Sequence, residues 1–140
     1  MELTNFTDYG LRALMRLAGA PERLFTTSEI ACEFRLSQAH LVKIVQRLAA
    51  SGFVETRRGK GGGFRLARPS EAIRPGDVVR ALEESFPMVE CFQQDGCDCA
   101  LLPGCGLKAR LSRAEQAFIN DLNGSTLADL AWRPIPEPAA

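Results

Sequence analysis

Apolar side chains recur at helical spacing in the first part of the chain, with polar capping residues between the apolar runs. The spacing predicts a helix over residues 8–18, with Thr7 as its N-cap and Gly19 just past its end. A second helix is expected to begin at Thr27 or Ser28, since either hydroxyl could cap it. The pattern therefore opens with two amphipathic helices.

A third helix is predicted from Ser37, which can cap it, to about Ala50. Residues 35–37 leave room only for a short turn before it, so the second and third helices have the spacing of a helix-turn-helix. The buried face of the third helix is expected to carry Leu41, Ile44, Val45 and Leu48.

A pair of short strands is predicted directly after this helix, over residues 53–57 and 63–67. Residues 58–62, between the strands, read Arg-Gly-Lys-Gly-Gly and form a basic, glycine-rich loop. A strand, a basic loop and a second strand after a recognition helix form a wing. The predicted fold class is therefore mostly α with a small β wing, a winged helix-turn-helix.

The second half of the chain is helical at its two ends and irregular between them. A fourth helix is predicted over residues 74–84, and residues 86–106 show no convincing period. A long helix is then expected from Leu107 to about Leu122. Residues 133–138 are rich in proline and are expected to be extended or disordered.

The long helix carries an apolar stripe. The rest of a domain of this size is too small to bury it. We expect this helix to pair two subunits of a homodimer, and the alternative is a helix in the core of the monomer. The stripe consists of Leu107, Leu111, Ala114, Phe118 and Leu122. The expected parts are a DNA-binding region (1–70), a linker helix with a cysteine-rich loop (71–106), the dimerisation helix (107–124) and a C-terminal tail (125–140).

Charge is unevenly divided along the chain, although its formal net charge is zero. Residues 1–70 carry 11 Lys and Arg against 6 Asp and Glu, whereas residues 71–140 carry 6 against 11. A basic first half favours a polyanion as its partner. No apolar run is long enough to span a membrane and no secretory signal precedes the first helix, so we expect no membrane partner and a cytoplasmic protein.

The start of the third helix and the wing are the candidate contacts to double-stranded DNA. A recognition helix presents the residues of its N-terminal part to base edges in the major groove. Here these residues are Ser37, Gln38, His40 and Lys43. The basic wing residues suit phosphate or minor-groove contacts, and they are Arg57, Arg58, Lys60 and Arg65.

Four of the five cysteines lie within fifteen positions, at Cys91, Cys97, Cys99 and Cys105. Such a cluster in a reducing compartment indicates a metal site or a redox centre rather than disulfides. Thiolates favour zinc, copper(I) or iron–sulfur clusters, and the wide spacings without a paired Cys-x2-Cys knuckle fit an iron–sulfur cluster. A zinc-stabilised regulator and a thiol oxidoreductase using Cys97 and Cys99 remain open, but the second lacks a catalytic context, so an enzyme is not expected.

Four segments taken together, residues 3–14, 41–45, 57–66 and 76–80, resemble the iron–sulfur winged-helix repressors that include NsrR, IscR and RirA. The resemblance extends over residues 2–131. Within this group the chain is most similar to NsrR, the nitric-oxide-sensing repressor, through Phe6-Thr7-Asp8-Tyr9 and Val89-Glu90-Cys91-Phe92.

The resemblance implies that three cysteines hold the cluster, the last two separated by five residues. Cys91, Cys99 and Cys105 match this pattern. Resemblance to NsrR further implies a fourth ligand from the first helix of the partner subunit, which corresponds to Asp8; a helix-dipole role for Asp8 is the alternative. Cys97 is additional to the family pattern and is therefore an alternative ligand.

The expected function is that of a dimeric repressor that binds a pseudo-palindromic operator and loses affinity when nitric oxide attacks its cluster. A 4Fe–4S cluster is expected in preference to a 2Fe–2S cluster. Cys105-Gly106-Leu107 is also similar to RirA, the iron-responsive regulator, so sensing of iron status is the alternative.

Overall fold

The computed structural model describes residues 2–84, 87–93 and 97–139, and within these ranges it contains five α-helices and one two-stranded antiparallel sheet. The expected class, mostly α with a small β wing, agrees with this architecture. The elements are α1 (Asn5–Ala18), α2 (Thr27–Phe34), α3 (Gln38–Ala50), β1 (Val54–Arg57), β2 (Gly63–Leu66), α4 (Pro75–Leu82) and α5 (Gly106–Leu122). Short 3-10 turns lie at Ser70–Ala72, Glu90–Phe92 and Ala128–Leu130.

The first two helices begin earlier than their apolar periods predicted. Thr4, not Thr7, is the N-cap of α1, and the Thr7 side chain is buried. Thr26, not Thr27 or Ser28, caps α2, because only Thr26 is followed three residues later by Glu29. The Thr26 hydroxyl accepts a hydrogen bond from the Glu29 amide (3.1 Å), and the Glu29 carboxylate accepts one from the Thr26 amide (2.8 Å). The cap predicted for α3, Ser37, is confirmed.

The three N-terminal helices and the wing enclose one hydrophobic core. Each helix directs its apolar face inward, and the wing closes the core through the pairing of Val54 with Leu66. An isolated bridge between Phe25 and Phe64 fastens the chain before α2 to β2. The largest fully buried side chains of this unit include Phe25, Phe64, Leu14, Leu17, Ile30, Leu41, Ile44 and Leu48.

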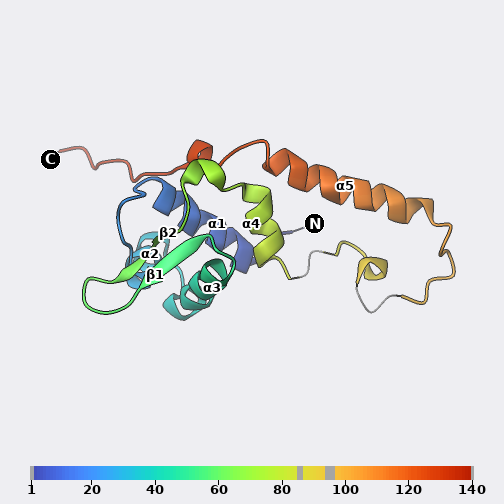
Figure 1. The fold of residues 1–140 in the computed structure, drawn as a ribbon, viewed down its shortest axis with the longest axis horizontal. Coiled ribbons are helices and arrows are strands. Elements are labelled where there is room, and N and C mark those ends of the chain that lie inside the picture. The colour runs from blue at the N-terminus through green and yellow to red at the C-terminus, as the bar shows by residue number, and fades with distance from the viewer. Residues whose placement is uncertain (1, 85–86, 94–96, 140) are drawn as a thin grey trace.

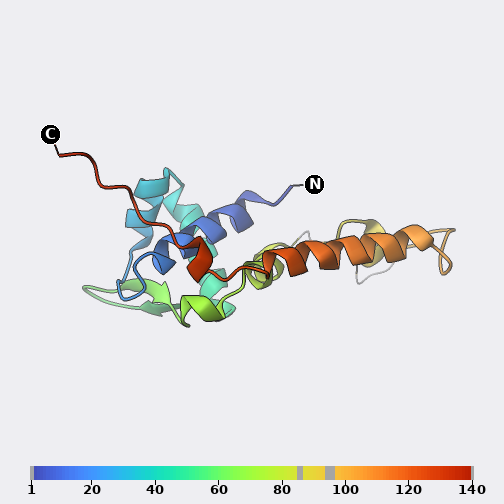
Figure 2. The same ribbon diagram turned by 90° about the horizontal axis from the view of Figure 1, so that it is seen from above.

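Helix α4 joins this unit to the rest of the molecule through two close approaches that require glycine. A Cβ atom at Gly10 of α1 would overlap the Leu82 side chain of α4, and one at Gly76 of α4 would overlap the backbone of Ile119 in α5. Beyond this crossing, α5 projects away from the winged unit, and the segment that carries the cysteines lies beside it (Figures 1 and 2).

The chain returns to the winged unit after α5 and packs across it, as Figure 1 shows. Leu127 is fully buried, and its amide donates to the Ile73 carbonyl (2.8 Å). The Trp132 amide donates to the Met15 carbonyl (2.9 Å), and its ring lies 5.5 Å from that of Phe34. This return fixes the C-terminal end of α5 to the winged unit.

Candidate functional site

The start of α3 presents a polar, accessible surface. Ser37, Gln38 and Lys43 are exposed. The Ser37 hydroxyl accepts a hydrogen bond from the His40 amide (3.3 Å), so this side chain is engaged in capping the helix. Gln38 and Lys43 therefore remain exposed polar side chains at this end of the helix that are not engaged in capping it.

His40 differs from its neighbours on α3 because its ring packs against α1. The ring centroid lies 5.8 Å from that of Phe6 and 5.7 Å from that of Tyr9. The residue is half-buried. Packing against α1 therefore sets the orientation of the His40 ring.

The wing separates its four cations into two kinds. Arg57, Arg58 and Lys60 are exposed, and the described residues include no ion-pair partner for any of them. Arg65 instead faces Glu55 across the hairpin, and its Nε donates to the Glu55 carboxylate (2.7 Å). The three unpaired cations are thus better suited than Arg65 to bind phosphate.

The four clustered cysteines are free thiols that differ in exposure. Cys91, Cys97 and Cys105 are half-buried, whereas Cys99 is exposed. Cys91 lies in the 3-10 turn Glu90–Phe92, and Cys105 is the N-cap of α5, where its sulfur accepts a hydrogen bond from the Lys108 amide (3.4 Å).

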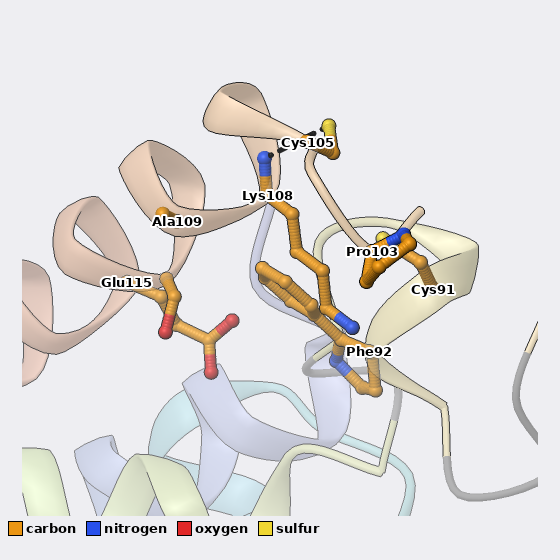
Figure 3. A pocket seen from close by; sticks show the side chains of 9 residues that line it. Cys91, Phe92, Pro103, Cys105, Lys108, Ala109 and Glu115 are labelled. Atoms are coloured by element: carbon orange, nitrogen blue, oxygen red, sulfur yellow. Dashed lines mark hydrogen bonds between the residues drawn. The ribbon is translucent and has the colours of Figure 1, made fainter. Parts of the chain in front are cut away.

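A cavity of about 750 Å³ lies between this turn and the first half of α5. Cys91 and Cys105 line it together with Lys108 and Glu115 of α5 (Figure 3). One carboxylate oxygen of Glu115 is buried and has no hydrogen-bond partner among the described residues. The cavity thus brings together two of the three cysteines implied by the family resemblance.

Cys97 lies close to the other thiols. Partial burial raises the pKa of the Cys97 thiol, and the neighbouring Cys91, Cys99 and Glu90 raise it further. A hydrogen bond between the side chains of Cys91 and Cys97 acts in the same direction. The position that departs from the family pattern is therefore near a thiol that matches it.

The donor chemistry of this loop fits an iron–sulfur cluster, because soft thiolate sulfurs are the ligands that such a cluster takes. In the described part of the chain, no three cysteine, histidine, aspartate or glutamate side chains are already assembled as metal ligands. The structure thus brings Cys91 and Cys105 to one cavity and places Cys97 beside Cys91, but it does not arrange a complete ligand shell.

Asp8 lies in the first turn of α1, and both its carboxylate oxygens are bound by Arg12, at 3.0 and 2.7 Å. Both side chains are well exposed. To serve a partner subunit, Asp8 would have to exchange this ion pair for its new contact.

Three contacts at the end of α4 were not foreseen from the sequence. Glu83 is only 8% exposed, and its carboxylate accepts hydrogen bonds from the amide (3.0 Å) and hydroxyl (3.1 Å) of Thr4. Arg47 of α3 donates to the Ala81 carbonyl (3.3 Å) and forms an ion pair with Glu84. Two acidic side chains at the C-terminal end of a helix interact unfavourably with the helix dipole. This unfavourable placement is the feature of the sequence that could have indicated that each acid has a specific partner.

Comparisons with known proteins match the whole arrangement rather than one motif. A family model named Rrf2 and described as an iron-dependent transcriptional regulator matches residues 3–133. CymR of B. subtilis, the global cysteine regulator, is similar in structure with a TM-score of 0.75 and 30% sequence identity, covering 94% of this chain and 96% of that one.

Two further solved structures show the same likeness. IscR of T. potens has a TM-score of 0.72 and 27% identity, covering 93% of this chain and 85% of that one. CymR of Staphylococcus aureus has a TM-score of 0.70 and 27% identity, covering 95% of this chain and 100% of that one.

Among the described residues, no helix is both long enough and apolar enough to cross a membrane.

The family match covers nearly the entire chain, and the likeness in fold to CymR extends over 94% of it. The chain therefore belongs to the Rrf2 family, and it is a winged-helix, DNA-binding transcriptional regulator rather than an enzyme.

Proposed function

We propose that this regulator is a homodimeric repressor whose affinity for DNA is set by an iron–sulfur cluster, with nitric oxide as the signal. The observation that carries the proposal is the group of four free thiols on one loop, two of which line a common cavity, in a family described as iron-dependent. Resemblance to NsrR supports a 4Fe–4S cluster and the nitric oxide signal.

Cys91, Cys99 and Cys105 would hold the cluster, and Asp8 of the partner subunit would complete its ligand set. When bound, the cluster would supply iron that reacts with nitric oxide and so links the signal to DNA affinity. A carboxylate suits the fourth position because a hard oxygen ligand holds this iron less firmly than a thiolate does. The ion pair with Arg12 orients that carboxylate until it is engaged.

The choice of an iron–sulfur cluster over zinc is based on spacing and room. A structural zinc site takes four ligands about 2.0–2.3 Å from one ion, commonly in paired Cys-x2-Cys knuckles. Here the thiols are spread over fifteen residues, and two of them, Cys91 and Cys105, border a cavity of about 750 Å³. A larger thiolate-bound group fits this arrangement better than a single ion.

The DNA-binding part of the proposal uses the contacts exposed on α3 and the wing. Gln38, His40 and Lys43, with Ser37 at the cap, would face base edges in the major groove. Arg57, Arg58 and Lys60 would bind phosphates or enter the minor groove, with Arg65 in a supporting place. A two-fold dimer would read a pseudo-palindromic operator.

The dimer is proposed to form through α5. Only Ile119 of this helix is buried, whereas Leu107 is 63% exposed and Leu111, Phe118 and Leu122 are half-buried. A helix that leaves an apolar stripe in contact with water gains free energy by covering it with a second copy.

A second candidate signal is iron status, as in the RirA-like reading. The observation that favours it is the description of the family as iron-dependent. In that case loss of iron from the loop, rather than reaction with nitric oxide, would change DNA affinity.

The proposal is tested by purifying the protein without oxygen and measuring iron and acid-labile sulfide. Wild type should be brown and hold both. Cys91→Ser, Cys99→Ser and Cys105→Ser should each lose the cluster, and Cys32→Ser, an exposed thiol on α2, is the matched control that should keep it. Titration with nitric oxide and with an iron chelator, each followed by DNA binding, separates the two signals.

Two results would change the ligand assignment. Loss of the cluster in Cys97→Ser but not in Cys99→Ser would make Cys97 the second thiolate ligand. Loss in Cys97→Ser together with unchanged behaviour of Asp8→Ala would indicate an all-cysteine site. A colourless protein that contains zinc would overturn the proposal.

A further inference from the structure

Glu83 is a buried acid whose position calls for a physical explanation. It is the C-cap of α4 and only 8% exposed. Removing a carboxylate from water is costly unless hydrogen bonds replace the lost hydration. Among the described residues, its carboxylate accepts hydrogen bonds from a single residue, Thr4, through the backbone amide and the hydroxyl.

Thr4 is itself the residue that starts α1. Its hydroxyl accepts a hydrogen bond from the Thr7 amide (3.4 Å), and its carbonyl accepts one from the Asp8 amide (3.0 Å). Asp8 is therefore linked to Glu83 through two successive hydrogen bonds: the Asp8 amide donates to the Thr4 carbonyl, and Thr4 donates to the Glu83 carboxylate. The first turn of α1 is thus connected to this buried carboxylate.

The same carboxylate lies at the base of the cysteine loop. Glu83 ends α4, and Cys91 follows eight residues later along the chain. The close packing of Gly10 against Leu82 holds α1 and α4 together at this point. Glu83 thus joins the element that carries Asp8 to the element from which the cysteines depart.

We propose that Glu83 is a positioning residue that sets the place of Asp8 relative to the cysteine loops of the dimer. The inference depends on the proposed function, in which Asp8 serves the cluster of the partner subunit. In such a dimer, the junction between Glu83 and Thr4 links the base of one subunit's own loop to the ligand that this subunit lends to its partner. A change in the conformation of either cysteine loop would then alter both cluster sites of the dimer.

The first test uses the metal-free protein and needs no cluster. Hydrogen exchange is measured on the backbone amides of residues 4–8 in wild type, Glu83→Gln and Glu83→Ala. A hydrogen bond to a charged group contributes enough that its loss should speed local exchange by about tenfold in Glu83→Ala. Glu83→Gln, which keeps an acceptor oxygen, should show a smaller increase. Unchanged exchange in both variants would overturn the proposal.

The second test asks whether Glu83 acts through Asp8. The rate of cluster loss under air is followed by visible absorption in wild type, Glu83→Ala, Asp8→Ala and the double variant. We expect Glu83→Ala to lose the cluster severalfold faster than wild type, and to have no further effect once Asp8 is replaced. Equal acceleration in both backgrounds would show a purely structural role and overturn the proposal.

Glu33→Ala is the matched control, because Glu33 is a partly buried acid of the same unit that pairs with Arg16 on the side of α2. Its effect on cluster loss should be the same with and without Asp8. If wild type holds no cluster, the proposed function fails, and the exchange measurement still decides whether Glu83 positions α1. Where Glu83→Ala does not fold, Glu83→Gln carries both tests.

Discussion

The winged unit and the cysteine region of this regulator differ in how completely they bury their apolar side chains. In the winged unit, three capped helices and a hairpin enclose side chains that are fully buried, and the caps are satisfied by Thr4, Thr26 and Ser37. In the region that follows α4, Leu101 is 67% exposed and α5 buries Ile119 alone. The DNA-binding surface is therefore preformed by its own core, whereas the loop and α5 bury few of their own apolar side chains.

This difference suits a sensor. A reader of DNA must hold its recognition helix in place, and a dense core does so. A switch needs a region whose conformation is poised between states and can be biased by a ligand or a partner subunit. We infer that the dimer contact along α5 and the metal group together supply what the cysteine region lacks.

The largest effect is expected from breaking the dimer. Leu111→Glu places a charge in the apolar stripe of α5 and should give monomers, because a buried unpaired charge is costly. Without the linkage of two half-sites, affinity for a full operator should fall by about 10²–10⁴-fold. Arg110→Glu, on an exposed position of the same helix, is the control. Sedimentation that shows an intact Leu111→Glu dimer would place the interface elsewhere.

A contrast in stability between the two regions is the next expectation. Leu48→Ala, in the core of the winged unit, should lower the free energy of unfolding by about 2–5 kcal/mol. Leu101→Ala, at a 67% exposed position, should change it by no more than about 0.5 kcal/mol. Urea unfolding of the metal-free variants measures both values. Similar losses in the two variants would contradict the difference between the regions.

Within the DNA-binding surface, the recognition helix should provide specificity. Gln38→Ala should reduce discrimination at one base pair by about 1–3 kcal/mol if the Gln38 amide bonds that base in two places. The measurement compares binding to a selected operator, its single-base variants and random DNA. Equal losses on specific and random DNA would count against direct readout by Gln38.

The wing should contribute affinity without specificity, and the smallest effect is expected there. Arg58→Ala should weaken binding to all sequences and reduce the slope of log affinity against log salt by about 0.9. Arg65→Ala should change this slope less, because Arg65 is already paired with Glu55. A slope change in Arg65→Ala that equals that in Arg58→Ala would show that the ion pair opens on DNA.

Much of the fold was predictable from the sequence because local patterns and tertiary packing agree in the winged unit. Ser37 as the cap of α3 and the strands on either side of the basic loop were both anticipated correctly. The caps of α1 and α2 were misplaced by one to three residues, since neighbouring hydroxyls of similar capping strength compete and only a side chain such as Glu29 decides between them.

Contacts between distant segments were not predictable. Trp132 packs on Phe34, about a hundred positions away in the sequence. Glu83 is hydrogen-bonded to Thr4, 79 positions away. No periodic pattern of apolar residues indicates such pairs. The sequence identified the four thiols as a group, but it did not show which of them are ligands. Cys97 and Cys99 are two positions apart in a segment without a regular period, so the pattern cannot distinguish them.

The central claim is that the cysteine loop controls the DNA affinity of a preformed winged unit, and one measurement tests it most directly. DNA selected from a random pool by the anaerobically purified protein is titrated with that same preparation before and after removal of its iron. The account predicts tight binding by the iron-loaded dimer and an affinity at least about tenfold lower after iron is removed, a free-energy difference of about 1.4 kcal/mol. Equal affinities before and after removal would contradict it.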